Sequence, residues 1–190
     1  EFEEFFSAFV TALPPLTGAD ILMYAGYGRL QMIGRNPYEI TPAEVFRGQF
    51  DPVLRWTERP WQDTPSVYGP ITSWTQLVAN KFGAENMHDI VFWLQMFSVV
   101  PFILACAGAV MLARGDTRRQ GRLALLTIAN PLLIWAVVAG AHNEPLAVMF
   151  AVGGLLFMRT NPFVAGLGIG LAGCAKVSIG LWGLAMLWAY

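Results

Sequence analysis

The chain has 190 residues, of which 55% are hydrophobic and only 13% are charged, and its formal net charge is −1. A soluble domain carries about 25% charged residues, so this composition indicates a membrane protein. The near-neutral charge gives no electrostatic basis for binding nucleic acid, and Cys106 and Cys174 have no zinc-like spacing with histidine.

The first apolar stretch is short and acidic at its start. Residues 4–15 are predicted to be the end of an earlier span or an interfacial helix, because Glu3 and Glu4 argue against a complete span. The chain begins without a methionine and ends inside an apolar run, so we interpret it as a fragment of a longer protein.

A long polar and aromatic region follows. Residues 17–88 are rich in Pro, Trp and Tyr, a mixture typical of a structured segment on a membrane surface. We expect short interfacial helices within it at 42–48 and 71–82. The first of them is preceded by Thr41, which begins a capping-box pattern with proline at the first helical position.

The remainder contains uncharged runs, and a helix needs about 20 apolar residues to cross a bilayer. Pro101 and the Asn130–Pro131 pair are predicted to kink the first two of these spans. The fold class we expect is an all-α polytopic membrane protein, with residues 1–190 forming part of one transmembrane domain. Its spans, the last one incomplete, are predicted at 90–113, 123–141, 145–158, 162–175 and 177–190.

A basic loop sets the expected orientation. Residues 113–122 contain four arginines against the single acid Asp116, so the positive-inside rule places this loop in the cytoplasm. Counting spans from there places residues 17–88 outside, together with the segment 142–144 and Lys176. Polar side chains that are far apart in the sequence are therefore expected to converge on one face.

Each of these polar side chains has a structural alternative. Asp20 is either a functional carboxylate or the N-cap of a helix beginning at Ile21. Glu144, with Asn143 before it, is either functional or an acid that complements a helix dipole. Lys176 is either a cation for a lipid phosphate or an interfacial lysine whose ammonium reaches the membrane surface.

Two patterns point away from cofactors. Residues 168–173 match G-x-G-x-x-G, but no strand precedes them and they lie in a membrane run, so a dinucleotide site is rejected. Gly166 and Gly170 form a GxxxG pattern that predicts close helix packing. No D-x-D pair is present, which argues against a carboxylate-bound metal, and we expect neither a metal nor a cofactor.

Several short motifs, taken together, resemble the GT-C superfamily of integral-membrane glycosyltransferases. The closest resemblance is to actinobacterial polyprenyl-phosphate-mannose-dependent alpha-1,6-mannosyltransferases. The resemblance covers roughly residues 14–176. The motifs that carry it are Asp20, Tyr24, Tyr27-Gly28, "GRNPY" (34–38), "VYGP" (67–70), "GAHNE" (140–144) and "GLAGCAK" (170–176).

This resemblance implies an inverting hexosyltransferase with Asp20 as the general base. It implies mannosyl transfer from a polyprenyl-phosphate-sugar donor to a mannan or lipoglycan acceptor, at the extracytoplasmic side of the plasma membrane. An inverting displacement needs one base and no nucleophilic carboxylate. The substrate-binding residues it implies are Tyr24, Arg29, Arg35, Tyr38, Tyr68, His142, Asn143, Glu144 and Lys176.

Two other classes of protein remain open. An outward-facing cavity with Lys176 and Glu144 would also suit a transporter of a small solute, although no internal repeat is visible. A non-catalytic truncated homologue would show the same motifs. The rest of the gene discriminates between them, because a glycosyltransferase continues with further spans and a transporter with a second, similar half.

Overall fold

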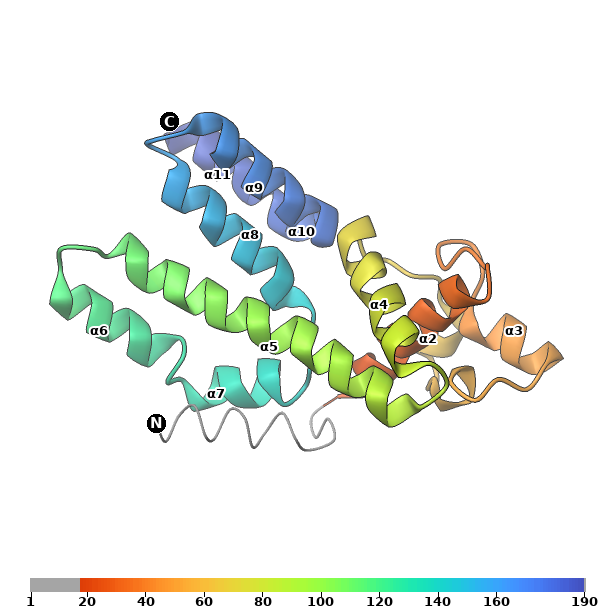
Figure 1. Ribbon diagram of the computed structural model, residues 1–190. Coiled ribbons are helices and arrows are strands. Elements are labelled where there is room, and N and C mark those ends of the chain that lie inside the picture. The colour runs from red at the N-terminus through yellow and green to blue at the C-terminus, as the bar shows by residue number, and fades with distance from the viewer. Residues whose placement is uncertain (1–17, 190) are drawn as a thin grey trace.

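The computed structural model describes residues 18–189, and the described part of the chain is helical with no strand (Figure 1). The predicted N-terminal helix at 4–15 lies outside the described residues. The helices in chain order are α2 (Asp20–Met32), α3 (Pro42–Gly48), α4 (Pro70–Gly83), α5 (Met87–Leu112), α6 (Thr117–Leu126), α7 (Pro131–Leu133), α8 (Glu144–Phe157), α9 (Pro162–Ala175), α10 (Val177–Gly180) and α11 (Trp182–Ala189).

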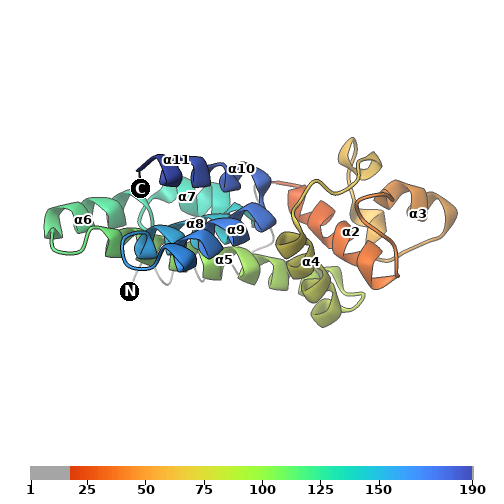
Figure 2. The same cartoon turned by 90° about the horizontal axis from the view of Figure 1, so that it is seen from above.

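The helices form two groups joined by the long helix α5. Helices α2, α3 and α4 gather at one end of the molecule, and α6 to α11 lie along the rest of α5 (Figure 2). In Figure 1, α6 and α7 lie on one side of α5 and the hairpin of α8 and α9 lies on the other. Helix α8 packs on both α5 and α9, while α4 contacts α2, α5 and α9.

The two short helices predicted from the sequence at 42–48 and 71–82 are present. Helix α3 has the predicted bounds and the full capping box, in which Thr41 and Glu44 each accept a hydrogen bond from the other's backbone. Helix α4 extends the predicted 71–82 by one residue at each end. Two short 3-10 turns, Leu54–Trp56 and Trp61–Asp63, lie between them.

A close crossing holds α2 against α4. An added Cβ on Gly28 would lie 2.2 Å from the backbone oxygen of Gln76, so only glycine allows the two backbones this close. Asn80 fixes the crossing, because its fully buried side-chain Nδ2 donates to the carbonyl of Ala25 at 3.0 Å. The crossing sets the position of the start of α2, where Asp20 lies.

Two helical segments are long and apolar enough to cross a membrane. They are Met87–Leu112, with 26 residues, and Thr117–Val138, with 22. Pro101 lies inside the first without ending it. The second differs from the predicted span 123–141, because it begins within the basic loop and is interrupted at 127–130.

The interruption has a local cause. Asn130 leaves the helix and its side chain caps the next turn by accepting from Leu132 N at 3.0 Å, while Pro131 takes the first helical position. Residues Ile134–Val138 then form a π-helix. The predicted kink at Asn130–Pro131 is thus a complete break in the helix.

Helices are present at the positions of the spans predicted at 145–158 and 162–175. Helices α8 and α9 each have 14 residues, a length of about 21 Å at 1.5 Å per residue. This is less than the ~30 Å hydrocarbon core of a bilayer. The predicted helix 177–190 is divided at Leu181 between α10 and α11.

The predicted GxxxG contact is wrong for the described residues. Added Cβ atoms on Gly166 and Gly170 would meet nothing within 4 Å. The close contact between α8 and α9 is made instead by Gly154 and Gly168, where a Cβ on Gly168 would lie 2.8 Å from the Gly154 Cα. The glycines that pack are the ones that face the partner helix, and residue spacing alone does not identify that face.

Candidate functional site

The Asp20 carboxylate stands at the N-terminal end of α2 without capping it. Ala19 is the N-cap residue, and no side chain makes a capping hydrogen bond there. The predicted alternative of Asp20 as an N-cap is therefore wrong, because Asp20 is already the first helical residue. Its side chain is 45% exposed, so the carboxylate is partly open to solvent.

His142 reaches Asp20 from the turn that precedes α8, and Glu144 is the first residue of that helix. Ala141 has φ of 49°, a left-handed conformation that reverses the chain between the π-helix and α8. His142 Nδ1 then lies 3.8 Å from Asp20 Oδ2 and 3.8 Å from Glu144 Oε2. The imidazole is thus placed between two carboxylates that come from different helices.

Lys176 completes the cluster from the break between α9 and α10. It is the extended residue that ends one helix and begins the other, with φ of −147° and ψ of 115°. Its Nζ donates to Glu144 Oε1 in an ion pair. The side chains of Lys176 and Glu144 are 34% and 39% exposed.

The start of α4 fixes the position of Lys176. Gly69 N donates to Ala175 O at 3.2 Å, and Thr72 Oγ1 donates to the same carbonyl at 2.9 Å. A Cβ on Gly69 would lie 2.0 Å from Cys174 O, so this approach requires glycine. The "VYGP" motif therefore holds the end of α9, directly before Lys176.

The Lys176 ammonium controls the ionisation of Glu144. Burial alone raises the pKa of the Glu144 carboxyl. The hydrogen bond from Lys176 and the positive charges of Lys176 and His142 outweigh this effect and hold the pKa below its usual value. Glu144 is consequently an anion at neutral pH, and the cluster brings together two carboxylates, one imidazole and one ammonium.

Two tyrosines form the aromatic side of the cluster. The rings of Tyr24 and Tyr68 meet edge to face with centroids 5.2 Å apart. Burial, the neighbouring Tyr68 and then the negative charges of Glu144 and Asp20 raise the pKa of Tyr24 far above its usual value, and burial raises the pKa of Tyr68 as well. Both phenols therefore stay neutral and can act as hydrogen-bond partners for a substrate.

A narrow cavity of about 10 Å³ lies beneath the cluster, and the side chains of Tyr24, Gln76 and Asn143 line it. The Gln76 side chain is 1% exposed, and neither of its amide atoms has a protein hydrogen-bond partner. Asn143 Nδ2 is also buried without one. Sequence reasoning missed Gln76, because a single glutamine in a polar, aromatic helix carries no distinguishing pattern.

The structure does not bring Arg29, Arg35 or Tyr38 into this cluster. Arg29 forms ion pairs with Asp51 and Glu85, each at 2.8 Å. It is nine residues beyond Asp20 in α2, about 14 Å along the helix. Arg35 is exposed beside α3, and the Tyr38 hydroxyl donates to Ser73 Oγ at 2.9 Å.

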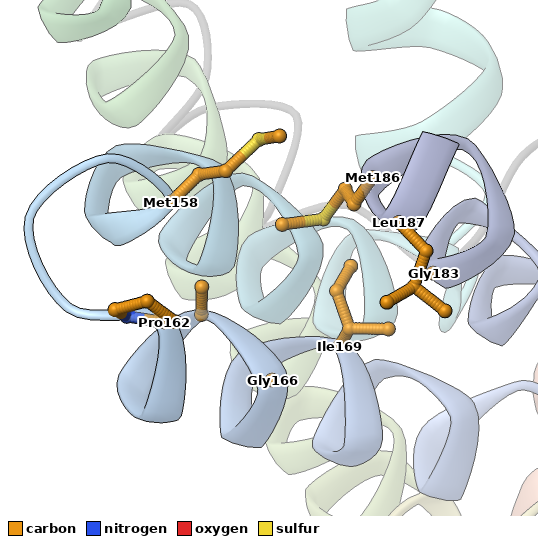
Figure 3. A pocket seen from close by; sticks show the side chains of 8 residues that line it. Met158, Pro162, Gly166, Ile169, Gly183, Met186 and Leu187 are labelled. Carbon is orange, nitrogen blue, oxygen red and sulfur yellow. The ribbon is translucent and has the colours of Figure 1, made fainter. Parts of the chain in front are cut away.

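A larger pocket of about 350 Å³ lies away from these polar groups, between α8, α9 and α11 (Figure 3). Its lining is apolar and includes Met158, Ile169, Gly183 and Met186. It offers no group for acid–base chemistry. Among residues 18–189, no group of three His, Cys, Asp or Glu side chains is placed to hold a metal ion.

Comparisons with known proteins agree on one relationship. The sequence model described as "Alpha-(1->6)-mannopyranosyltransferase, N-terminal domain" matches residues 6–190. Alpha-(1->6)-mannopyranosyltransferase B of Corynebacterium glutamicum is 27% identical over 93% of the chain and 27% of its own length. A probable alpha-(1->6)-mannopyranosyltransferase of Mycolicibacterium smegmatis is 27% identical over 76% of the chain and 26% of its own length.

The chain thus spans about a quarter of the length of these curated relatives. Alpha-(1->6)-mannopyranosyltransferase A of Corynebacterium glutamicum is similar as well, at 26% identity over 82% of the chain and 31% of its own length. No solved structure gives a significant match.

Proposed function

This chain belongs to the alpha-(1->6)-mannopyranosyltransferase family, matching its N-terminal domain, and we propose that it forms the catalytic end of such an enzyme. The enzyme transfers a mannosyl residue from polyprenyl-phosphate-mannose to a glycan or lipoglycan acceptor. The observation that carries the proposal is the cluster of Asp20, His142, Glu144 and Lys176, which three separate segments of the chain bring together.

Asp20 is the general base of this reaction. Its carboxylate accepts the proton of the acceptor hydroxyl while that oxygen bonds to the anomeric carbon. The bond from the anomeric carbon to the phosphate oxygen breaks, and its electron pair leaves with polyprenyl phosphate. A beta-linked donor and an alpha-linked product require one inversion, for which one carboxylate base suffices. Asp20 is the more exposed of the two carboxylates in the cluster.

Lys176 is the cation for the leaving phosphate. Its ammonium pairs with Glu144 Oε1, and its side chain is about one-third exposed. A fixed cation stabilises the charge that develops on the departing oxygen. Arg29 is a weaker choice because two acids already neutralise it, and Arg35 lies beside α3.

The sugar subsite is the space beside Tyr68 and Glu144. Tyr68 is only half-buried, whereas the Tyr24 ring lies behind it at 3% exposure. An aromatic face and an acceptor oxygen are what a hexose needs for stacking and for hydrogen bonds from its hydroxyls. Asn143, whose Nδ2 is buried, lines the small cavity beneath this subsite together with Tyr24.

The site faces the extracytoplasmic side of a multi-pass membrane protein in this proposal. The first candidate span ends at Leu112, directly before the basic loop predicted at 113–122, and the second begins within that loop at Thr117. The positive-inside rule places that segment in the cytoplasm and Asp20 on the opposite face. Exposed aromatic residues on the α2–α4 end, such as Trp61 and Trp74, suit the membrane surface.

The test uses the full-length protein in membranes with a radiolabelled polyprenyl-phosphate-mannose donor and a short alpha-mannoside acceptor. Extension of the acceptor by one alpha-linked mannose, read by an alpha-specific mannosidase, is the expected result. GDP-mannose and polyprenyl-phosphate-glucose serve as competing donors. Transfer from either of these and none from polyprenyl-phosphate-mannose would overturn the assigned donor.

A further inference from the structure

The His142 imidazole lies between the two carboxylates of the cluster. Its Nδ1 is equally far from Asp20 Oδ2 and Glu144 Oε2, at 3.8 Å from each. Both distances lie just beyond hydrogen-bond range, so a small rotation of the ring favours one carboxylate or the other. A ring nitrogen carries at most one proton, and therefore Nδ1 can donate to only one of the two at a time.

The two oxygens of Glu144 face different partners. Oε1 accepts from Lys176, whereas Oε2 is the oxygen that faces His142. Oε2 is buried and has no hydrogen-bond partner. An unpaired buried carboxylate oxygen costs free energy unless a donor reaches it, so Glu144 competes with Asp20 for the His142 proton.

Lys176 sets the strength of that competition. While Lys176 neutralises Glu144, the more strongly attracting acceptor for His142 is Asp20. A phosphate that draws the ammonium away leaves Glu144 with its full negative charge, and Glu144 then attracts the proton on Nδ1. The other titratable groups that sense the cluster, Tyr24 and Tyr68, remain neutral and do not alter this balance.

We propose that His142 is a positioning residue that serves Asp20 before donor phosphate binds and Glu144 afterwards. Donor binding thereby draws the Nδ1 proton away from Asp20 and makes its carboxylate a stronger base at the moment when the acceptor needs one. The proposal rests on the proposed function, in which Asp20 is the base and Lys176 meets the phosphate.

The experiment measures transfer by the full-length enzyme across pH 4 to 8, with polyprenyl-phosphate-mannose as the donor. The pH dependence of kcat/KM for the donor, at saturating acceptor, reports the pKa of the base before the donor binds. The pH dependence of kcat reports the pKa of the base in the complex with the donor. Each rate falls at low pH as the base is protonated, and this part of the profile is called its acid limb. In the wild type we expect the acid limb of kcat to lie about 1 pH unit above that of kcat/KM, which is the shift that a nearby charge causes in a pKa.

Two variants remove the competition in different ways. In Glu144→Gln and in His142→Gln, the two acid limbs are expected to coincide. Glu144→Gln also frees Lys176, so the KM for the donor falls by about two- to fivefold, the fold-change that corresponds to one exposed ion pair. A merely structural role for Glu144 would raise this KM or leave it unchanged.

Matched controls are available on the surface of the molecule. His88→Gln changes a histidine that is 82% exposed, and Asp63→Asn removes an acid from an exposed ion pair with Arg47. Both are expected to keep the wild-type separation of the two limbs. Thermal unfolding of each variant checks its folding. If His142→Gln does not fold, the separation of the two acid limbs in Glu144→Gln alone tests the role of His142.

The possible outcomes separate the two proposals. Wild-type transfer with limbs that coincide, or with the same separation in Glu144→Gln, overturns the role of His142 and leaves the proposed function intact. Absence of any wild-type transfer from the mannose donor overturns the proposed function itself. Separate limbs in the wild type that coincide in both variants support the competition for one proton.

Discussion

At the scale of single residues, the Lys176–Glu144 ion pair is the contact that most directly joins distant parts of the cluster, because its two residues are 32 positions apart in the chain. The folded protein holds the pKa of Glu144 below its usual value, so folding favours the ionised carboxylate. The stability that this pair contributes is present above the unfolded pKa of about 4.3 and is lost as the pH falls through the lower folded value.

Glu144→Gln is therefore expected to lower the unfolding temperature at pH 7. The variant should then lose less stability than the wild type on acidification to pH 3, because it has no carboxylate to protonate. The measurement is thermal unfolding in detergent at both pH values, with Asp63→Asn as the control for a solvent-screened acid. An equal loss in wild type and variant would show that Glu144 is not held as an anion.

At the scale of helices, the site depends on glycines that bring backbones together. Gly28 sets the crossing of α2 and α4, and Gly69 sets the approach of α4 to the end of α9. Each contact positions one charged residue of the cluster, Asp20 in the first case and Lys176 in the second. Small errors in such supporting contacts are transmitted to the reacting groups.

Gly28→Ala is expected to destabilise the protein by about 1–3 kcal/mol, the usual cost of overpacking. The added Cβ would lie 2.2 Å from Gln76 O, so the α4 backbone must move. Gly153→Ala in α8 is the matched control, since a Cβ there meets nothing within 4 Å. Chemical denaturation measures the free energy of unfolding of both variants. Equal losses in the two would contradict the close contact of α2 with α4 at Gly28.

The sequence allowed prediction of elements with strong local signals. The capping box and proline at Thr41–Glu44 gave the bounds of α3, and span counting predicted that Asp20, Glu144 and Lys176 converge. It could not show that Asp51 and Glu85 neutralise Arg29, because those pairs join residues 22 and 56 positions apart. Gln76 was missed for the same reason, since only the folded chain buries it.

At the scale of the whole molecule, the proposed orientation in the membrane rests on one basic loop. The basic loop, which continues into the start of α6, and the α2–α4 end lie far apart on the elongated molecule (Figure 2). The positive-inside rule then assigns the two ends of α5 to opposite sides of the membrane. The 26 residues of α5 are long enough to connect them.

Single cysteines test this orientation in intact cells. With Cys106 and Cys174 replaced by alanine, a cysteine at exposed Glu39 should react with a membrane-impermeant maleimide, and one at exposed Thr117 should react only after permeabilisation. The reverse pattern would place the site in the cytoplasm. Reaction of both positions in intact cells would show that α5 does not cross the membrane.

The central claim is that the Asp20 carboxylate is the base, and one comparison tests it most directly. Full-length wild type, Asp20→Asn and the surface control Asp63→Asn are mixed with radiolabelled donor and acceptor in a single turnover. Asparagine keeps the shape of Asp20 but accepts no proton, so Asp20→Asn is expected to bind the donor and to transfer at least about 100-fold more slowly. Transfer by Asp20→Asn at the wild-type rate would contradict the account and move the search for the base to Glu144.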